Sequence, residues 1–307
     1  MVRVPPEPFL PTRYAGSIDR SAIDAAWQRL SASVCGTIRP AAGSLPGQLG
    51  FGNGATQWSS YATLPPIVDL PFFVAPGAAP ELLAAAREAH WRGGFLGLAL
   101  DRLADGQASR GVRGDLLDAL REAWVESLSV VSGARAEASS SVDEVLARAA
   151  AGFAMESVCA QVGTMDVQVY ADIVREKTAW FGLASRMLFA RSRVRDLHVF
   201  DELFEQLMLS LQTFDDAEDE HEDRLLRGRS IPDLLGLAPT CLVTVSAELA
   251  RLGRRAARRC GLDALDAWLE ERETLMATAS VERPLALDFM GAAMLLERVK
   301  RRASWTT

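Results

Sequence analysis

The densest group of side chains that could carry chemistry is an acidic run that begins at Gln212. It contains Asp215, Asp216 and Asp219, and on a helix Asp215 and Asp219 lie one turn apart on one face, with Asp216 beside them. Apolar residues precede the run at the spacing of a buried helix face: Phe204, Leu207, Met208, Leu211 and Phe214. Carboxylates close to a helical core need a cation or hydrogen bonds to offset their repulsion. The run therefore predicts a metal site, with a solvated acidic helix face as the alternative.

A second acidic pair, Asp101 and Asp105, has the same spacing at the end of another apolar segment. Alone it is compatible with an ordinary helix C-terminus, although acids there oppose the helix dipole. Two such pairs on facing helices would suit Mg²⁺, which typically takes one or two carboxylates and completes its coordination with water and substrate phosphates. The pairs together predict a substrate that carries a diphosphate.

Basic and aromatic side chains could complete such a site. The candidate contacts to a diphosphate are Lys177 and Thr178, Arg110, Arg113 and Arg229, although each cation taken alone is more often a surface charge. Aromatic faces could stabilise a carbocation in an apolar pocket, although aromatic side chains on a helix are more often plain core. The candidates for pocket lining are Phe95, Phe153, Trp180, Phe181 and Phe214, with Gly93, Gly94 and Gly97 as small residues that would set the depth of the pocket.

The elements that must position these residues are predicted to be helices. Beyond Pro80, apolar residues recur every three or four positions and proline is rare. The predicted helices span 80–105, 114–132, 141–163, 166–192, 196–222, 231–259, 262–279 and 284–302. Ser141 and Glu144 resemble a capping box, and Gly133, Gly163 and Gly261 stand where helices should end.

The amino-terminal quarter differs in composition. Residues 1–20 are rich in proline and indicate an extended arm, a short helix follows over about 21–34, and residues 36–80 are dense in Gly, Pro and Ser, which predicts a loop or cap. We therefore expect one all-α domain, in which an amino-terminal segment (1–80) precedes a helical catalytic bundle (81–307).

Composition excludes several classes of function. The 307-residue chain has a formal charge of −7, which argues against a nucleic-acid partner. Its four cysteines form no C-x-x-C pair, which favours a reducing compartment over a disulfide or zinc framework. We found no apolar segment long enough to span a membrane and no leader-like start, so a cytoplasmic location is expected.

Two motifs resemble the trans-isoprenyl diphosphate synthases and the class I terpene synthases, which share one all-helical fold. The second aspartate motif of this family is similar to Gln212, Asp215, Asp216 and Asp219, followed by Gly228-Arg229 and Asp233-Leu234. The family's Tyr-x-x-Ile-x-x-x-Lys-Thr-Ala helix is similar to the segment from Tyr170 to Ala179. Asp101 and Asp105 resemble the outer members of the first aspartate motif, and Arg110 stands where an arginine follows it. The resemblance covers about residues 80–240.

The chain also departs from the family pattern. Arg102 replaces the second aspartate of the first motif, Arg229 replaces a lysine and Gly111 replaces an arginine. The segment that binds isopentenyl diphosphate in chain-elongating members is reduced to Arg39-Pro40, without its lysine. Both acidic motifs can also be written Asp-x-x-x-Asp, as in squalene and phytoene synthases, but the Gln-to-Asp spacing fits the trans-synthase pattern better. The loss of charge weakens the case for condensing two diphosphates.

The resemblance implies a class I terpene synthase of the isoprenoid synthase fold, with a central active-site cavity. Such an enzyme would ionise a linear prenyl diphosphate and cyclise or rearrange the carbocation. The implied cofactor is a set of about three Mg²⁺ ions, which Asp101, Asp105, Asp215 and Asp219 would hold. The other implied contacts are Asp216 and Lys177 in catalysis, and Arg110, Arg113, Lys177, Thr178, Gln212 and Arg229 around the diphosphate. The alternatives are a trans-prenyltransferase and a non-catalytic helical partner protein. Members of the family are often dimers, which implies a homodimer.

Overall fold

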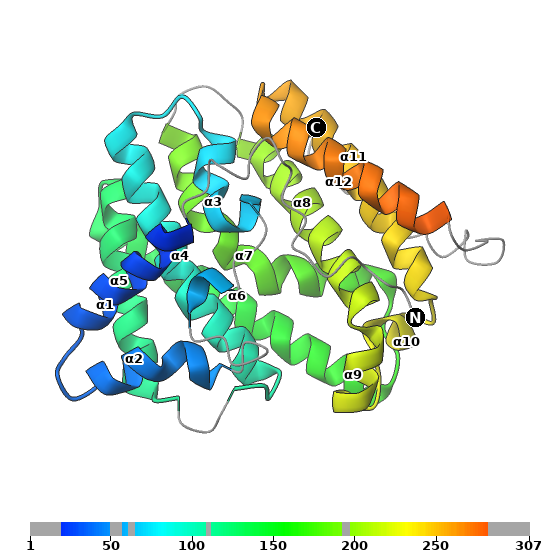
Figure 1. Cartoon of the computed structure of the whole chain (residues 1–307), viewed down its shortest axis with the longest axis horizontal. Helices are drawn as coiled ribbons and strands as arrows, with labels where there is room; N and C mark the ends of the chain where they lie inside the picture. Colours follow the sequence, from blue (N-terminus) through cyan, green and yellow to red (C-terminus); the bar gives the residue numbers. More distant parts are fainter. Residues whose placement is uncertain (1–19, 50–56, 61–64, 109–111, 192–196, 282–307) are drawn as a thin grey trace. The chain divides into compact units, whose positions relative to one another are not determined.

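The computed structural model describes residues 20–49, 57–60, 65–108, 112–191 and 197–281, and all regular structure within these ranges is helical (Figure 1). The predicted all-α class is confirmed. The helices are α1 (Arg20–Ser33), α2 (Arg39–Gln48), the 3-10 turn η1 (Trp58–Ser60), α3 (Pro65–Val74), α4 (Pro80–Ala104), α5 (Gly114–Ser132), α6 (Arg135–Val162), α7 (Val167–Arg191), α8 (Leu197–Glu218), α9 (Glu220–Arg227), α10 (Ile231–Leu235), α11 (Pro239–Arg259) and α12 (Asp263–Val281).

Several predicted boundaries are wrong. Residues 36–80 contain α2 and α3 instead of one loop, and prolines at or near their first positions start both helices. Helix α6 begins at Arg135, so Ser141 lies inside it and caps nothing. The predicted helix 231–259 is divided because Gly236, with φ of 64°, ends α10 and Pro239 starts α11. Gly133 and Gly163 end helices at positive φ as expected. The predicted helix 284–302 and most of the arm 1–20 lie outside the described residues.

The chain divides into two compact units. Among the described residues, unit 1 comprises 148–178 and 197–281, and unit 2 comprises those up to 147 together with 179–191, so that α6 and α7 each contribute to both. The single-domain prediction, with its boundary at residue 80, stays a prediction.

The core of unit 2 is aromatic. Trp27 of α1, Trp58 of η1 and Phe95 of α4 are buried, with ring centroids 4.8–5.4 Å apart. Helix α4 packs on α5, where a Cβ at Gly93 would lie 2.7 Å from the Trp124 ring. This glycine therefore allows a close helix contact.

The core of unit 1 is built around α8, which packs against α11, while α11 packs against α12. Buried residues of α7, α8 and α11 form one apolar cluster that includes Tyr170, Ile173, Val174, Leu209, Val245 and Leu249. The amino-terminal part of α7 is thereby fixed in the same core as α8.

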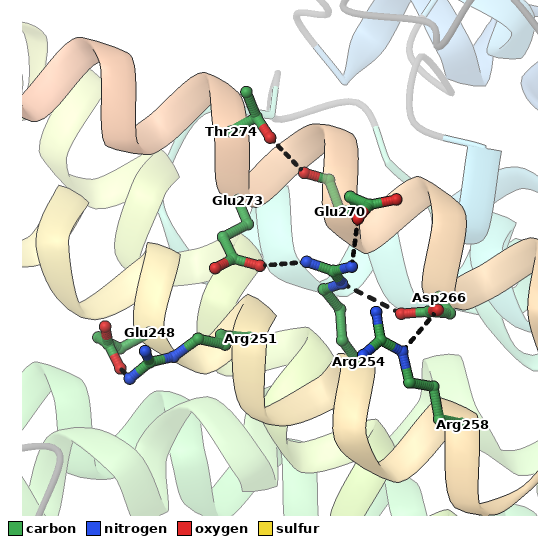
Figure 2. A network of polar contacts seen from close by, with 8 residues as sticks. All are labelled: Glu248, Arg251, Arg254, Arg258, Asp266, Glu270, Glu273 and Thr274. Atoms are coloured by element: carbon green, nitrogen blue, oxygen red, sulfur yellow. Dashed lines mark hydrogen bonds and ion pairs between the residues drawn. The ribbon is translucent and has the colours of Figure 1, made fainter.

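An ion-pair network fastens α11 to α12 (Figure 2). The guanidinium of Arg254 donates to Asp266 at 3.1 Å, Glu270 at 2.5 Å and Glu273 at 2.7 Å, and the side chain is only 14% exposed. Arg258 donates to the other oxygen of Asp266 at 2.8 Å. Arg254 therefore contributes to the contact between the two helices, because three carboxylates of α12 lie within its reach.

One helix of the described ranges, α6, is long and apolar enough to pass as a membrane span by composition, and 17% of its most apolar stretch is buried. The whole helix also carries charged residues, among them Glu137, Asp143, Arg148 and Glu156. In the described part of the chain, a single helix of this kind is only weak evidence for a membrane span.

Candidate functional site

A buried hydrogen-bond cluster joins α7 to α8. The Tyr170 hydroxyl donates to Oδ2 of Asp216 at 2.6 Å, and Nε2 of Gln212 donates to Oδ1 at 2.9 Å. Gln212 and Asp216 are four residues apart, so one face of α8 presents both. Burial raises the pKa of Asp216 to about 7, although the two hydrogen bonds favour its charged form. Burial and the neighbouring Asp216 charge raise the pKa of Tyr170.

Lys177 lies further along α7 and faces α6. Its Nζ is 2.6 Å from Oε2 of Glu156 and 5.2 Å from the centroid of the Phe153 ring. A Cβ at Gly152 would lie 2.9 Å from the backbone nitrogen of Lys177, so the missing side chain lets α6 and α7 approach here. Thr178, the next residue, is buried and its hydroxyl donates to the Val174 carbonyl at 2.7 Å. Glu156 is not among the residues predicted from the sequence. The one local indication of it is that it lies one helical turn after Gly152, where α6 and α7 approach.

A pocket of about 180 Å³ opens beside Glu156 in unit 1. Its lining comes from α6 and from the chain between α9 and α10: Glu156, Ala160, Asp223, Arg227, Gly228, Arg229, Ser230, Ile231 and Leu234. Arg227 approaches Oε1 of Glu156 at 3.8 Å and Oδ1 of Asp223 at 3.6 Å. Arg229 donates to the Gly163 carbonyl at 3.0 Å. Two arginines and two carboxylates therefore border this pocket.

The local sequence fixes the loop that carries Arg229. Gly228 ends α9 with φ of 78°, and Ser230 with Asp233 forms a capping box at the start of α10. Arg224 donates to both oxygens of Asp233. These hydrogen bonds hold the pKa of Asp233 well below its usual range. Asp233, which the family motif contains, thus orders the loop instead of entering the pocket.

Asp215 and Asp219 lie on the exposed last turn of α8 and at its end. Their spacing fits a Mg²⁺ ion that takes one or two carboxylates and completes its shell with water and phosphate. In the described part of the chain, no group of three or more His, Cys, Asp or Glu side chains is arranged as a metal site. Both oxygens of Asp216 already accept hydrogen bonds from neutral donors. Asp215 and Asp219 thus fit a Mg²⁺ site whose remaining ligands would come from water and from a bound phosphate. Asp216 is not part of that site.

Phe214, predicted to line a pocket, belongs to a cation–π stack. The guanidinium carbon of Arg272 lies 5.0 Å from the Phe214 ring and 5.6 Å from the Trp268 ring. Arg272 is 7% exposed, and burial lowers its pKa to about 10, so it stays charged at neutral pH. No pattern in the sequence predicts this buried charge, which lies beside the acidic end of α8.

The remaining predicted residues belong to unit 2. Asp101 lies in the last turn of α4 and Asp105 follows its end, whereas Arg110 lies outside the described residues. Arg113 precedes α5 and donates to both oxygens of Asp115 on the surface.

The predicted lining residues of unit 2 pack within that unit. Phe95 packs in the aromatic core, and Phe181 stacks on Trp180 with centroids 3.5 Å apart. Gly97 faces the Trp180 ring so closely that a Cβ would clash. Of the predicted site residues, Gln212, Asp216, Lys177 and Arg229 thus belong to unit 1. Gly97, Trp180 and Phe181 belong to unit 2.

Comparison with known proteins gives no assignment: no family model, curated protein or solved structure matches this chain.

Proposed function

We propose that the protein is a Mg²⁺-dependent class I terpene synthase of the isoprenoid synthase fold. It would ionise a linear prenyl diphosphate and cyclise or rearrange the resulting carbocation in an apolar cavity. A cytoplasmic location and a homodimer belong to the same proposal, as do the metal-binding roles of Asp101, Asp105, Asp215 and Asp219.

The observation that supports the proposal most is the 2.6 Å hydrogen bond from Tyr170 to Asp216. The two residues belong to separate segments, 46 positions apart, each of which resembles a different motif of the family. If the two segments resembled the family only by chance, their polar residues would not be expected to form a buried hydrogen bond with each other. The neighbouring pocket adds Arg227 and Arg229, and arginine binds phosphate oxygens in bidentate geometry.

In the proposed reaction, Arg227 and Arg229 bind oxygens of the diphosphate, and Lys177 adds charge from α7. The carbon–oxygen bond of the allylic ester breaks, its electron pair leaves with the diphosphate, and the positive charge stays on the hydrocarbon. Cations that face the departing oxygen contribute several kcal/mol in a site closed to water, each donor about 3 kcal/mol. Mg²⁺, when bound, would act as a Lewis acid that polarises the same leaving group.

Incubation of the purified protein with farnesyl or geranylgeranyl diphosphate and Mg²⁺ tests the proposal. We expect pyrophosphate release and an extractable hydrocarbon from one substrate, without isopentenyl diphosphate. Asp215→Ala and Lys177→Ala should lower the rate at least about 100-fold. Asp172→Asn, which alters a half-buried ion pair with Arg175 on the same helix, is the matched control.

Longer diphosphates that form only when isopentenyl diphosphate is added would identify a prenyltransferase instead. No pyrophosphate release from any prenyl diphosphate would leave the non-catalytic helical partner as the function.

A further inference from the structure

One buried arginine of unit 1 has no polar partner. Arg272 of α12 is 7% exposed, and its guanidinium carbon lies 5.0 Å from the centroid of the Phe214 ring and 5.6 Å from that of Trp268. Within the described residues, its Nε makes no hydrogen bond and its guanidinium joins no ion pair. Proteins rarely leave a buried charge without hydrogen bonds, because the lost hydration is strongly unfavourable. This guanidinium therefore requires an explanation.

The neighbouring acidic residues of α12 face another helix. Glu270 and Glu273 accept hydrogen bonds from Arg254 of α11 (Figure 2). Because successive residues of a helix are about 100° apart, Arg272 is turned by roughly 200° from Glu270 and by about 100° from Glu273. It shares its face with Trp268, one turn earlier, and this face is directed to α8. Arg272 is therefore not part of the ion-pair network between α11 and α12.

The guanidinium of Arg272 is directed to the acidic end of α8. The carboxylates of Glu218 and Asp215 lie close enough to raise the pKa of Arg272, although burial, the larger effect, lowers it to about 10. Asp215 directly follows Phe214, whose ring the guanidinium covers. Asp215 and Asp219 are the two residues of α8 that the proposed function assigns to Mg²⁺. The buried cation thus borders the proposed metal site.

The charges around Arg272 restrict which anion could become its partner. The carboxylates of Glu218 and Asp215 would repel a bare anion, whereas a phosphate that arrives with Mg²⁺ would meet a neutralised surface. Mg²⁺ that binds one or two carboxylates completes its coordination with water and phosphate oxygens. A guanidinium offers planar donors that match a phosphate group, and the two aromatic rings hold this one in place before a ligand binds. A metal-bound phosphate therefore fits the unpaired donors of Arg272.

We propose that Arg272 is a phosphate contact of this acidic turn, and that it binds an oxyanion of a diphosphate held with Mg²⁺ at Asp215 and Asp219. The proposal rests on the proposed function for the Mg²⁺ site. The ligand-free protein contains a buried charge without hydrogen bonds, and binding of the diphosphate supplies them. Arg272 thereby makes the site favour a diphosphate that is already bound to metal.

Binding of inorganic pyrophosphate with Mg²⁺, and again with EDTA in place of Mg²⁺, tests this proposal. Titration calorimetry would compare the wild type with Arg272→Met, which removes the charge and keeps most of the volume, and with Arg272→Lys, which keeps the charge and loses the planar donors. Arg254→Met is the matched control, because Arg254 is 14% exposed and its donors are satisfied by three carboxylates. Thermal unfolding of each ligand-free protein is the second readout.

With Mg²⁺ present, Arg272→Met should bind pyrophosphate between about 10-fold and 100-fold more weakly than the wild type, because it loses charge-assisted hydrogen bonds. With EDTA, the two proteins should bind pyrophosphate equally. Without ligand, Arg272→Met should have a Tm roughly 2 °C higher than the wild type, because it removes an unpaired buried charge. Arg254→Met should have a lower Tm and unchanged binding.

Arg272→Lys should bind pyrophosphate at least about 3-fold more weakly than the wild type with Mg²⁺ present, since an ammonium group lacks the planar donors. This variant carries the comparison if Arg272→Met does not fold. A second series with farnesyl diphosphate and Mg²⁺ measures binding and pyrophosphate release by the wild type, which tests the proposed function separately.

Wild-type affinity in the Arg272 variants with Mg²⁺ present would overturn the role of Arg272, and pyrophosphate release from farnesyl diphosphate would then leave the proposed function standing. A Tm of Arg272→Met as low as that of Arg254→Met would also overturn it, because it would identify Arg272 as a structural partner. Weaker binding by the Arg272 variants without any release from farnesyl diphosphate would support the phosphate contact and count against the proposed function. If Mg²⁺ and pyrophosphate bind no form of the protein, both proposals are wrong.

Discussion

Asp216 shows how burial decides the role of a single residue. Asp216 is 8% exposed and its carboxylate accepts hydrogen bonds from Tyr170 and Gln212, so its environment differs from that of Asp215, the adjacent residue, which is exposed. Because burial disfavours the ionised form, the pKa of Asp216 rises to about 7. A group with a raised pKa in the folded state stabilises the fold at low pH and loses that contribution as the pH rises through its folded pKa.

Asp216→Asn should remove this pH dependence. Between about pH 4 and pH 8, the wild-type free energy of unfolding should fall relative to that of Asp216→Asn, by at most about 4 kcal/mol, since one pKa unit corresponds to about 1.4 kcal/mol. Urea denaturation at several pH values, with EDTA present, measures the difference. Asp172→Asn is the control. Parallel pH profiles for the wild type and Asp216→Asn would show that Asp216 keeps an ordinary pKa.

At the scale of elements, the contact between α6 and α7 depends on Gly152. A Cβ at this position would lie 2.9 Å from both the backbone nitrogen and Cγ of Lys177, and 3.2 Å from Cβ of Glu176. A backbone atom cannot rotate away as a side chain can, so a methyl group would push the helices apart. The displacement would also lengthen the 2.6 Å pair between Lys177 and Glu156.

Gly152→Ala should therefore destabilise the protein by about 1–2 kcal/mol, although alanine favours an exposed helix by about 1 kcal/mol over glycine. It should also weaken the binding of pyrophosphate, because the side chain of Glu156, which lines the pocket, would shift when its pair with Lys177 lengthens. Gly94→Ala on α4 is the matched control, since a Cβ there meets no atom within 4 Å. Denaturation and calorimetry measure the two effects. Stability equal to that of Gly94→Ala would contradict the close contact.

At the scale of the whole molecule, the chain carries a net charge of −7, yet two arginines, Arg227 and Arg229, line one small pocket of unit 1 beside Glu156 and Asp223. The local charge, and not the net charge, therefore determines whether an anion binds. A ligand that binds only the folded chain raises its stability in proportion to the logarithm of the ligand concentration.

Mg²⁺ and inorganic pyrophosphate added together, each at about 100 times its dissociation constant, should raise the free energy of unfolding by at least about 2.7 kcal/mol. For a chain of this size the increase corresponds to a rise in Tm of roughly 5 °C or more. Calorimetry or thermal fluorescence measures it, and EDTA should remove the part that depends on the metal. Arg229→Gln should reduce the shift. An unchanged Tm in the presence of both ligands would contradict a diphosphate site.

The sequence by itself determined the helical class and most helix positions. Periodic apolar residues and the glycines at 133 and 163 act through contacts within a few residues, so they can be interpreted locally. The same reasoning failed at residues 231–259, where Gly236 and Pro239 divide a continuous apolar pattern. It also placed Gln212, Asp216 and Lys177 in one predicted site, because two motifs resembled one family.

Only the tertiary structure decided which partners these residues have. Glu156 meets Lys177 across 21 residues, and Tyr170 meets Asp216 across 46. No periodic pattern in the sequence predicts either contact, because both depend on how α6, α7 and α8 pack. The burial that raises the pKa of Asp216 and leaves Asp215 exposed is likewise a property of the packed helices, because adjacent residues on a helix point about 100° apart.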